Sequence, residues 1–107
     1  MRIAVIGMGG VGGAFGGRLA VRYEGSVSLH QVVFIARGEH LMAIQEIGLN
    51  LITPDGIFLS RPYLATDDPK MAGEFDLVLF AVKSYGLEEA ARAIAGNIHD
   101  QTVIIPL

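Results

Sequence analysis

Residues 3–12 decide the fold, and they read Ile3-Ala4-Val5-Ile6-Gly7-Met8-Gly9-Gly10-Val11-Gly12. The first four residues form an apolar run typical of a buried strand. The glycines that follow have G-x-G-x-x-G spacing and stand where a strand should pass into a helix. A helix-like stretch from Gly10 to Tyr23 and a second apolar run, Val32 to Ala36, complete a βαβ pattern. This context indicates a dinucleotide-binding loop; a glycine-rich turn without a ligand is the alternative.

Each glycine of this loop has a predicted task. Gly7 permits the tight turn, Gly9 lets the backbone approach a pyrophosphate, and Gly12 allows the helix to pack close to the strand. The N–H groups at the start of the helix, with the helix dipole behind them, form an anion site. The loop is therefore expected to hold a phosphorylated ligand through its backbone.

The predicted first helix is unusually rich in glycine. Seven of the eleven residues from Gly7 to Gly17 are glycine, and each interior glycine costs on the order of 1 kcal/mol relative to alanine. Such a helix makes sense where its backbone closely approaches a sheet or a ligand. Gly9, Gly13 and Gly17 fall on one face, beside Gly12 and Gly16, and we expect this face to contact the sheet.

Composition narrows the class of protein. The 107 residues form one domain with a hydrophobic content of 51%, which excludes a disordered chain. The formal charge of −3 and the scattered basic residues argue against a nucleic-acid surface. The chain has no cysteine, so thiolate catalysis and cysteine metal sites are absent. No apolar stretch reaches about 18 residues, and we expect a cytoplasmic protein with no membrane contact.

The rest of the chain alternates predicted strands and helices. Residues 25–31 are read as a surface loop or an extended helix end. A short helix, Glu39 to Ile47, should point Leu41, Ile44 and Ile47 inward and stop at Gly48. The remaining expected elements are a hairpin (Leu49 to Ile52 and Ile57 to Leu59), a short strand (Tyr63 to Thr66), a central strand (Asp76 to Val82), an apolar helical stripe (Leu87, Ala90, Ala91, Ile94 and Ile98) and a last strand (Thr102 to Ile105). This order predicts an α/β fold of the Rossmann type, a doubly wound, mainly parallel sheet with helices on both faces and an inserted β-hairpin.

The end of the second strand bears on the choice of cofactor. NAD-binding units normally carry an acidic residue there, hydrogen-bonded to the ribose 2′-hydroxyl. Here the strand runs into Ala36-Arg37-Gly38, with no carboxylate before Glu39. A guanidinium grips a phosphate through two parallel hydrogen bonds, whereas a carboxylate repels it. Arg37 is therefore assigned to a 2′-phosphate and the cofactor to NADP(H); a solvated arginine is the alternative.

Few other residues are candidates for ligand binding, catalysis or metal binding. Lys83 ends the central strand, where open α/β sheets place their ligand crevice, so it could neutralise a phosphate or donate to a ribose or substrate oxygen. A solvated lysine is the alternative reading. The three histidines, His30, His40 and His99, have no metal-ligand spacing and are expected on the surface. We predict no catalytic residue and no metal site in this chain.

Several longer stretches resemble one known family, the ketopantoate reductases, also called 2-dehydropantoate 2-reductases. The resemblance spans nearly all 107 residues. It is carried by residues 2–13 with Phe15 to Ala20, Ala36 to Leu41, Pro54 to Gly56, Ala65 to Pro69, and Asp76 to Tyr85 with its Val82-Lys83-Ser84-Tyr85 end.

The resemblance implies a Rossmann-type NADPH domain of an enzyme that reduces ketopantoate to pantoate, on the route to pantothenate and coenzyme A. Arg37 would hold the 2′-phosphate, and Lys83 would contact the cofactor near its reacting end. The pyrophosphate would lie on Gly7, Met8, Gly9, Gly10, Val11 and Gly12. The complete enzyme would act on a small 2-keto acid, and a homodimer is compatible with the resemblance.

Two features depart from the family pattern. The connection from Tyr23 to Gln31 is longer than expected. The family also continues into a second, helical domain with its catalytic lysine and substrate-binding acid, and that domain is absent from this chain. The resemblance thus implies that residues 1–107 are the NADP-binding domain alone, which should not turn over substrate by itself.

Two other classes remain open at this stage. One is the Rossmann domain of another 2-keto acid or hydroxyacid dehydrogenase, such as a 6-phosphogluconate dehydrogenase relative. The other is a non-enzymatic nucleotide-sensing module. Such sensors commonly prefer NAD and would carry the carboxylate that is missing after the second strand.

Overall fold

The computed structural model describes residues 1–24 and 29–107. Within them, five parallel strands form one sheet in the order β5-β2-β1-β6-β7. The strands are β1 (Arg2–Ile6), β2 (Gln31–Ile35), β5 (Leu64–Thr66), β6 (Phe75–Phe80) and β7 (Ile98–Pro106). The helices are α1 (Gly10–Arg22), α2 (Gly38–Glu46) and α3 (Ser84–Ala93), with 3-10 turns η1 (Pro69–Ala72) and η2 (Ala95–Asn97).

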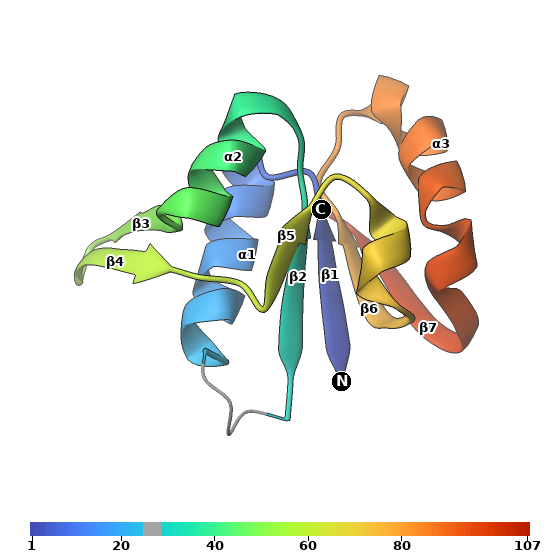
Figure 1. The fold of residues 1–107 in the computed structure, drawn as a ribbon, viewed down its shortest axis with the longest axis horizontal. Helices are drawn as coiled ribbons and strands as arrows, with labels where there is room; N and C mark the ends of the chain where they lie inside the picture. Colours follow the sequence, from blue (N-terminus) through green and yellow to red (C-terminus); the bar gives the residue numbers. More distant parts are fainter. Residues whose placement is uncertain (25–28) are drawn as a thin grey trace.

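The helices cover both faces of the sheet. Figure 1 shows α1 and α2 on one face, with α3 and η1 on the other. A separate antiparallel hairpin, β3 (Leu49–Thr53) and β4 (Gly56–Ser60), lies beside α1. The predicted doubly wound α/β fold with an inserted hairpin is therefore confirmed.

Two apolar clusters hold the layers together, one on each face of the sheet. Side chains alternate between the faces of a strand, so β1 contributes Val5 to one cluster and Ala4 and Ile6 to the other. On the first face, Val5 joins Phe34 of β2 and residues of α1 and α2. On the second face, Phe75 is fully buried with Val78, Phe80, Val33 and Ile94. Because β1 is buried on both faces, its continuous apolar run suits a central position in a parallel sheet.

The glycine-rich face of α1 divides its contacts between the sheet and the hairpin. A Cβ at Gly16 would lie 3.1–3.3 Å from Phe34, Met8 and Val5, so this glycine faces the sheet. A Cβ at Gly17 would instead lie 3.2 Å from Leu51 of β3. The hydroxyl of Ser60, which is fully buried, donates to the Gly17 carbonyl at 2.8 Å. The prediction of a single sheet-facing row was therefore wrong, because the hairpin packs along part of that row.

Gly9 and Gly13 complete this correction. A Cβ at Gly13 would meet only the carbonyl oxygen of Met8, at 3.5 Å, and a Cβ at Gly9 would meet nothing within 4 Å. Neither glycine makes room for the sheet. The close approaches at Gly12, Gly16 and Gly17 offset the low intrinsic helix propensity of α1.

Helix α2 and strand β6 both end earlier than the sequence predicted. Helix α2 ends at Glu46, so Ile47 is 62% exposed and does not point inward as expected. Gly48 then takes φ +103°, and its N–H bonds the Ile44 carbonyl at 2.9 Å, which confirms the glycine stop. The central strand runs from Phe75 to Phe80 and not to Val82.

The apolar stripe predicted after Lys83 is only partly buried. Helix α3 ends at Ala93, before Ile98, and a 3-10 turn follows. Ile94 is buried, but Leu87 is 42% exposed and Ala91 is exposed as well. In the connection expected over 25–31, residues 25–28 lie outside the described part of the chain.

Candidate functional site

The predicted loop follows β1 at the carboxyl edge of the sheet. The two strands that flank β1 there, β2 and β6, lie on opposite sides of it. Ile6, at the end of β1, is in register with Ile35 of β2 on one side and Phe80 of β6 on the other. The chain therefore passes from β1 to its neighbour β2, and later returns to the other side of β1 as β6. Open α/β sheets bind ligands in the crevice outside the strand ends at such a switch point.

Gly7 and Gly12 give the loop its shape. Gly7 has φ +90°, a left-handed conformation that favours glycine, and its N–H donates to the Ile35 carbonyl at 3.0 Å. A Cβ at Gly12 would lie only 1.8 Å from the carbonyl oxygen of Gly7 and 2.9 Å from Cβ of Ala81. Only glycine fits where α1 starts this close to the strand. The geometry has the two features that the motif predicts, the tight turn and the close packing.

Gly9 and the first turn of α1 leave room and donors for a ligand. A Cβ at Gly9 would meet no atom within 4 Å, so the absence of a side chain there is not explained by packing within the described chain. Gly9 is the N-cap of α1 and offers no capping side chain, and the first turn contains no acidic residue. The first N–H groups of a helix have no acceptor within the helix. Backbone donors, open space and the positive end of the helix dipole fit a pyrophosphate.

Met8 and Val11 have opposite surroundings in this loop. Met8 is only 4% exposed, and its side chain joins the core cluster with Phe34. It anchors the loop to the core, so only its backbone remains for a ligand. Val11 is 54% exposed on the first turn of α1. The motif gives each position between the glycines as any residue, so the sequence could not distinguish an anchor from an exposed side chain.

Arg37 lies two residues after the end of β2, on the same edge as the glycine loop. It is exposed and extended, with φ −151° and ψ 170°, and it precedes α2. Its guanidinium has no hydrogen bond or ion pair with any residue that the structure describes. Gly38 follows with φ +66° and nothing within 4 Å of an added Cβ. The arrangement leaves a cation free to meet an anionic ligand beside the loop.

Lys83 lies on the other side of the glycine loop. It is exposed, and its carbonyl accepts the N–H of Gly86 at 2.8 Å as α3 begins. Within residues 1–24 and 29–107 its ammonium has no partner. Because β1 separates β2 from β6, the strand ends that carry Arg37 and Lys83 are roughly 10 Å apart. The two cations flank the loop and do not form one cluster.

The opposite edge of the sheet holds a polar network that the sequence did not predict. The carboxylate of Asp76 accepts the backbone N–H of Arg2 at 2.7 Å and contacts Nε2 of His99 at 3.0 Å. The Arg2 hydrogen bond, followed by the His99 contact, lowers the pKa of Asp76 below its ordinary value. The Arg2 guanidinium is held by Oε1 of Gln31 at 2.9 and 3.2 Å. This network joins β1, β2, β6 and β7 at their amino ends, away from the glycine loop.

Two of the three histidines are therefore not plain surface residues. His99 has a side chain that is 28% exposed, and it pairs with Asp76. The ring of His30 packs edge-on against Tyr23, with centroids 4.8 Å apart. Of the three, only His40 is exposed as predicted, and the other two are partly buried. The expectation failed because both contacts depend on the folded arrangement: His99 meets Asp76 through the pairing of β6 with β7, and His30 meets Tyr23 at the end of α1.

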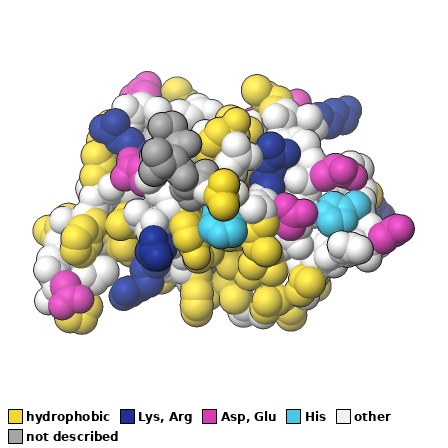
Figure 2. Space-filling model, turned by 90° about the horizontal axis from the view of Figure 1, so that it is seen from below, with side chains coloured by type: hydrophobic (Ala, Val, Ile, Leu, Met, Phe, Trp, Pro, Cys, Tyr) yellow, Lys and Arg dark blue, Asp and Glu magenta, His cyan; other side chains and the backbone are white. Residues whose placement is uncertain are grey.

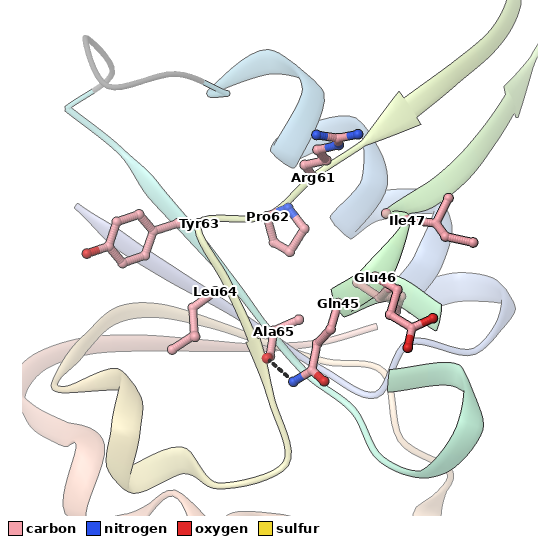
Figure 3. A pocket seen from close by; sticks show the side chains of 10 residues that line it. Gln45, Glu46, Ile47, Arg61, Pro62, Tyr63, Leu64 and Ala65 are labelled. Atoms are coloured by element: carbon pink, nitrogen blue, oxygen red, sulfur yellow. Dashed lines mark hydrogen bonds between the residues drawn. The ribbon is translucent and has the colours of Figure 1, made fainter. Parts of the chain in front are cut away.

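A hollow lies elsewhere on the described chain, along the edge strand β5. Figure 3 shows it between the end of α2 and the segment from Arg61 to Ala65. Its volume is about 410 Å³, and Nε2 of Gln45 donates across it to the Ala65 carbonyl at 2.9 Å. Neither the glycine loop nor Arg37 lines it. The predicted cofactor site therefore lies apart from this hollow.

Within the described residues, no group of three or more histidine and carboxylate side chains could hold a metal ion. Over the same ranges, no helix has the length and apolar character needed to cross a bilayer.

Fold and loop together define a class: an α/β domain of the Rossmann type with a glycine-rich βαβ unit at the switch point of its sheet. Comparison with known proteins narrows this class. The family model described as "Ketopantoate reductase PanE/ApbA" matches residues 3–107. The chain belongs to this family, as its sequence pattern predicted.

Individual relatives agree with this assignment. The chain is 40% identical to a 2-dehydropantoate 2-reductase of Halobacterium salinarum over 110 residues, covering 100% of the chain and 33% of that protein. A 2-dehydropantoate 2-reductase of Mesorhizobium japonicum is 34% identical over 107 residues, with 100% and 31% covered. A crystal structure of the enzyme from Porphyromonas gingivalis superposes with a TM-score of 0.91 at 44% identity, covering 100% of this chain and 38% of that one. The chain therefore spans about a third of the length of the relatives it matches.

Proposed function

We propose that this chain is the NADP(H)-binding domain of an oxidoreductase that reduces 2-dehydropantoate to pantoate in pantothenate and coenzyme A biosynthesis. The supporting observation is that Gly9 borders open space while Arg37, at the same edge of the sheet, has no partner among the described residues. The relatives named above are 2-dehydropantoate 2-reductases. When bound, NADPH would supply the hydride for reduction of the keto group.

The roles of the individual residues follow from their surroundings. The backbone from Gly7 to Gly12 would hold the pyrophosphate, with Met8 contributing its backbone alone. Arg37 would grip the 2′-phosphate, because a guanidinium matches phosphate oxygens with paired hydrogen bonds. Lys83, beyond β6, would neutralise a phosphate or donate to a ribose or substrate oxygen.

We assign cofactor binding, but not carbonyl reduction, to these residues. Carbonyl reduction needs a proton donor within about 2.6–3.2 Å of the developing alkoxide. The unpartnered groups beside the loop fit cofactor contacts better than an acid–base pair. We therefore propose that residues 1–107 bind the cofactor but do not turn over a 2-keto acid, and that the complete enzyme works in the cytoplasm.

The decisive experiment is a titration of NADPH and NADH against the wild type and Arg37→Ala. The wild type should prefer NADPH, and loss of the guanidinium should weaken NADPH by about 10- to 100-fold. NADH affinity should stay nearly constant, because NADH has no 2′-phosphate. Arg61→Ala is the matched control, since Arg61 is an exposed arginine beside the hollow and away from the loop. Equal affinities for the two nucleotides in the wild type would refute the NADP(H) assignment.

A further inference from the structure

A carboxylate stands next to the proposed phosphate-binding arginine. Glu39 is the first acidic residue after β2 and lies in the first turn of α2. It is exposed, and its carboxylate has no hydrogen bond or ion pair within the described part of the chain. It does not pair with Arg37, although only Gly38 separates the two residues. The edge beside the glycine loop thus presents both a free cation and a free anion.

Helix stability gives one reason for an acid at this position. A carboxylate in the first turn interacts favourably with the positive end of the helix dipole. This reason applies equally to a helix that binds no ligand. The position of Glu39 beside Arg37 adds a second consequence, because any charge here also acts on a ligand held by Arg37.

The two forms of the cofactor respond to that charge in opposite ways. A 2′-phosphate next to Arg37 is repelled by a nearby carboxylate, since like charges within a few ångströms raise the free energy of the complex. A ribose without the phosphate presents a hydroxyl that can donate a hydrogen bond to a carboxylate, and the acidic residue of NAD-binding units accepts this bond. Glu39 stands a few residues beyond that usual position, in the helix and not at the strand end.

We propose that Glu39 is a second specificity-determining residue, which opposes Arg37 and reduces the preference of this site for the 2′-phosphorylated cofactor. This inference rests on the proposed function, because it places the adenosine ribose beside Arg37. It predicts that the wild type binds both nucleotides, with NADPH bound more tightly by a limited factor.

Two other carboxylates lie at this edge of the sheet and could act on the same ligand. Thr66 ends β5 in register with Ile35, so Asp67 and Asp68 also lie near the start of α2. Asp68 accepts the backbone N–H of Lys70 at 3.1 Å and caps η1. Asp67 is exposed and has no partner among the described residues. Asp67 is therefore the competing candidate for the same effect.

The test compares Glu39→Gln with Asp67→Asn and Glu46→Gln by titration with NADPH and NADH at one fixed pH. Glu46 ends the same helix, beside the hollow and away from Arg37. Glu39→Gln should tighten NADPH by about 3- to 10-fold and leave NADH unchanged or weaker. The change should shrink at high salt, because mobile ions screen exposed charges. Asp67→Asn and Glu46→Gln should leave the ratio of the two affinities near its wild-type value.

The outcomes separate this inference from the proposed function. An equal change for both nucleotides would show that Glu39 serves only the helix, and it would overturn the inference. A shift in Asp67→Asn without one in Glu39→Gln would overturn it too. If Arg37→Ala lowers NADPH affinity while Glu39→Gln leaves the ratio constant, the inference fails and the proposed function stands. If Arg37→Ala has no effect on NADPH, the cofactor assignment itself fails.

Discussion

The two edges of the parallel sheet differ in how their polar groups are used. At the amino edge, which faces the viewer in Figure 2, Arg2, Gln31, Asp76 and His99 bond one another across four strands. At the carboxyl edge, the side chains of Arg37 and Lys83 have no partner among the residues described. A polar group whose hydrogen bonds are satisfied within the chain stabilises the fold, whereas an unpartnered one is available to a ligand.

The same contrast extends to the backbone. At the amino edge, the N–H of Arg2 is taken up by Asp76, and the hydroxyl of Thr102 donates to the Phe75 carbonyl at 2.7 Å. At the carboxyl edge, the first turn of α1 has no capping side chain, and Gly9 borders open space. The two edges thus separate stability from binding, and substitutions at each should affect mainly one of the two.

The largest expected effect comes from Gly12→Ala, which should disrupt both stability and binding. Its Cβ would lie 1.8 Å from the Gly7 carbonyl oxygen, so the backbone of the loop or the start of α1 must move. We expect a loss of about 3 kcal/mol or more in the free energy of unfolding, seen as a fall in Tm of more than about 10 °C. Thermal unfolding followed by circular dichroism measures the effect.

A neighbouring glycine provides the control for that substitution. Gly10→Ala places its Cβ where no atom lies within 4 Å, and Gly10 is also in the first turn of α1. It should leave Tm near the wild-type value. Equal stability of Gly12→Ala and Gly10→Ala would contradict the close packing of α1 against the loop.

The contrast between the edges also explains what could be predicted from the sequence. The placement of the glycine loop, Arg37 and Lys83 at the carboxyl edge could be predicted, because it depends on neighbouring residues; their roles in binding stay predictions. The amino edge was missed, because Asp76 and His99 are 23 residues apart and meet only through the pairing of β6 with β7. The inward side chain of Met8 was missed as well, since the motif leaves that position undefined.

The second prediction sharpens the assignment of the carboxyl edge to binding. Gly9→Val adds a branched side chain where the structure has open space, so the fold should stay intact. The same side chain would stand where the pyrophosphate must approach. We expect NADPH affinity to fall by more than about 100-fold, with Tm nearly unchanged. Undiminished binding by a folded Gly9→Val protein would mean that the loop is only a turn.

The smallest expected effect tests the amino edge through its pH dependence. The backbone N–H of Arg2 and the ring of His99 lower the pKa of Asp76 from its ordinary value of 3.8. A lowered pKa means that the ionised carboxylate stabilises the folded state above pH 3.8, and that this contribution is lost as the pH falls through the lowered value.

Asp76→Asn removes the charge but keeps an oxygen that can accept the Arg2 N–H. We therefore expect a modest fall in Tm at pH 7 and a flatter decline of Tm on acidification, with NADPH affinity unaltered because the loop lies at the other edge. Asp55→Asn, in the exposed turn of the hairpin, should reproduce the wild-type profile. A variant at Asp76 with the same Tm as the wild type from neutral to acidic pH would show that this network contributes nothing to stability, and the division between a stabilising edge and a binding edge would then rest on the glycine loop alone.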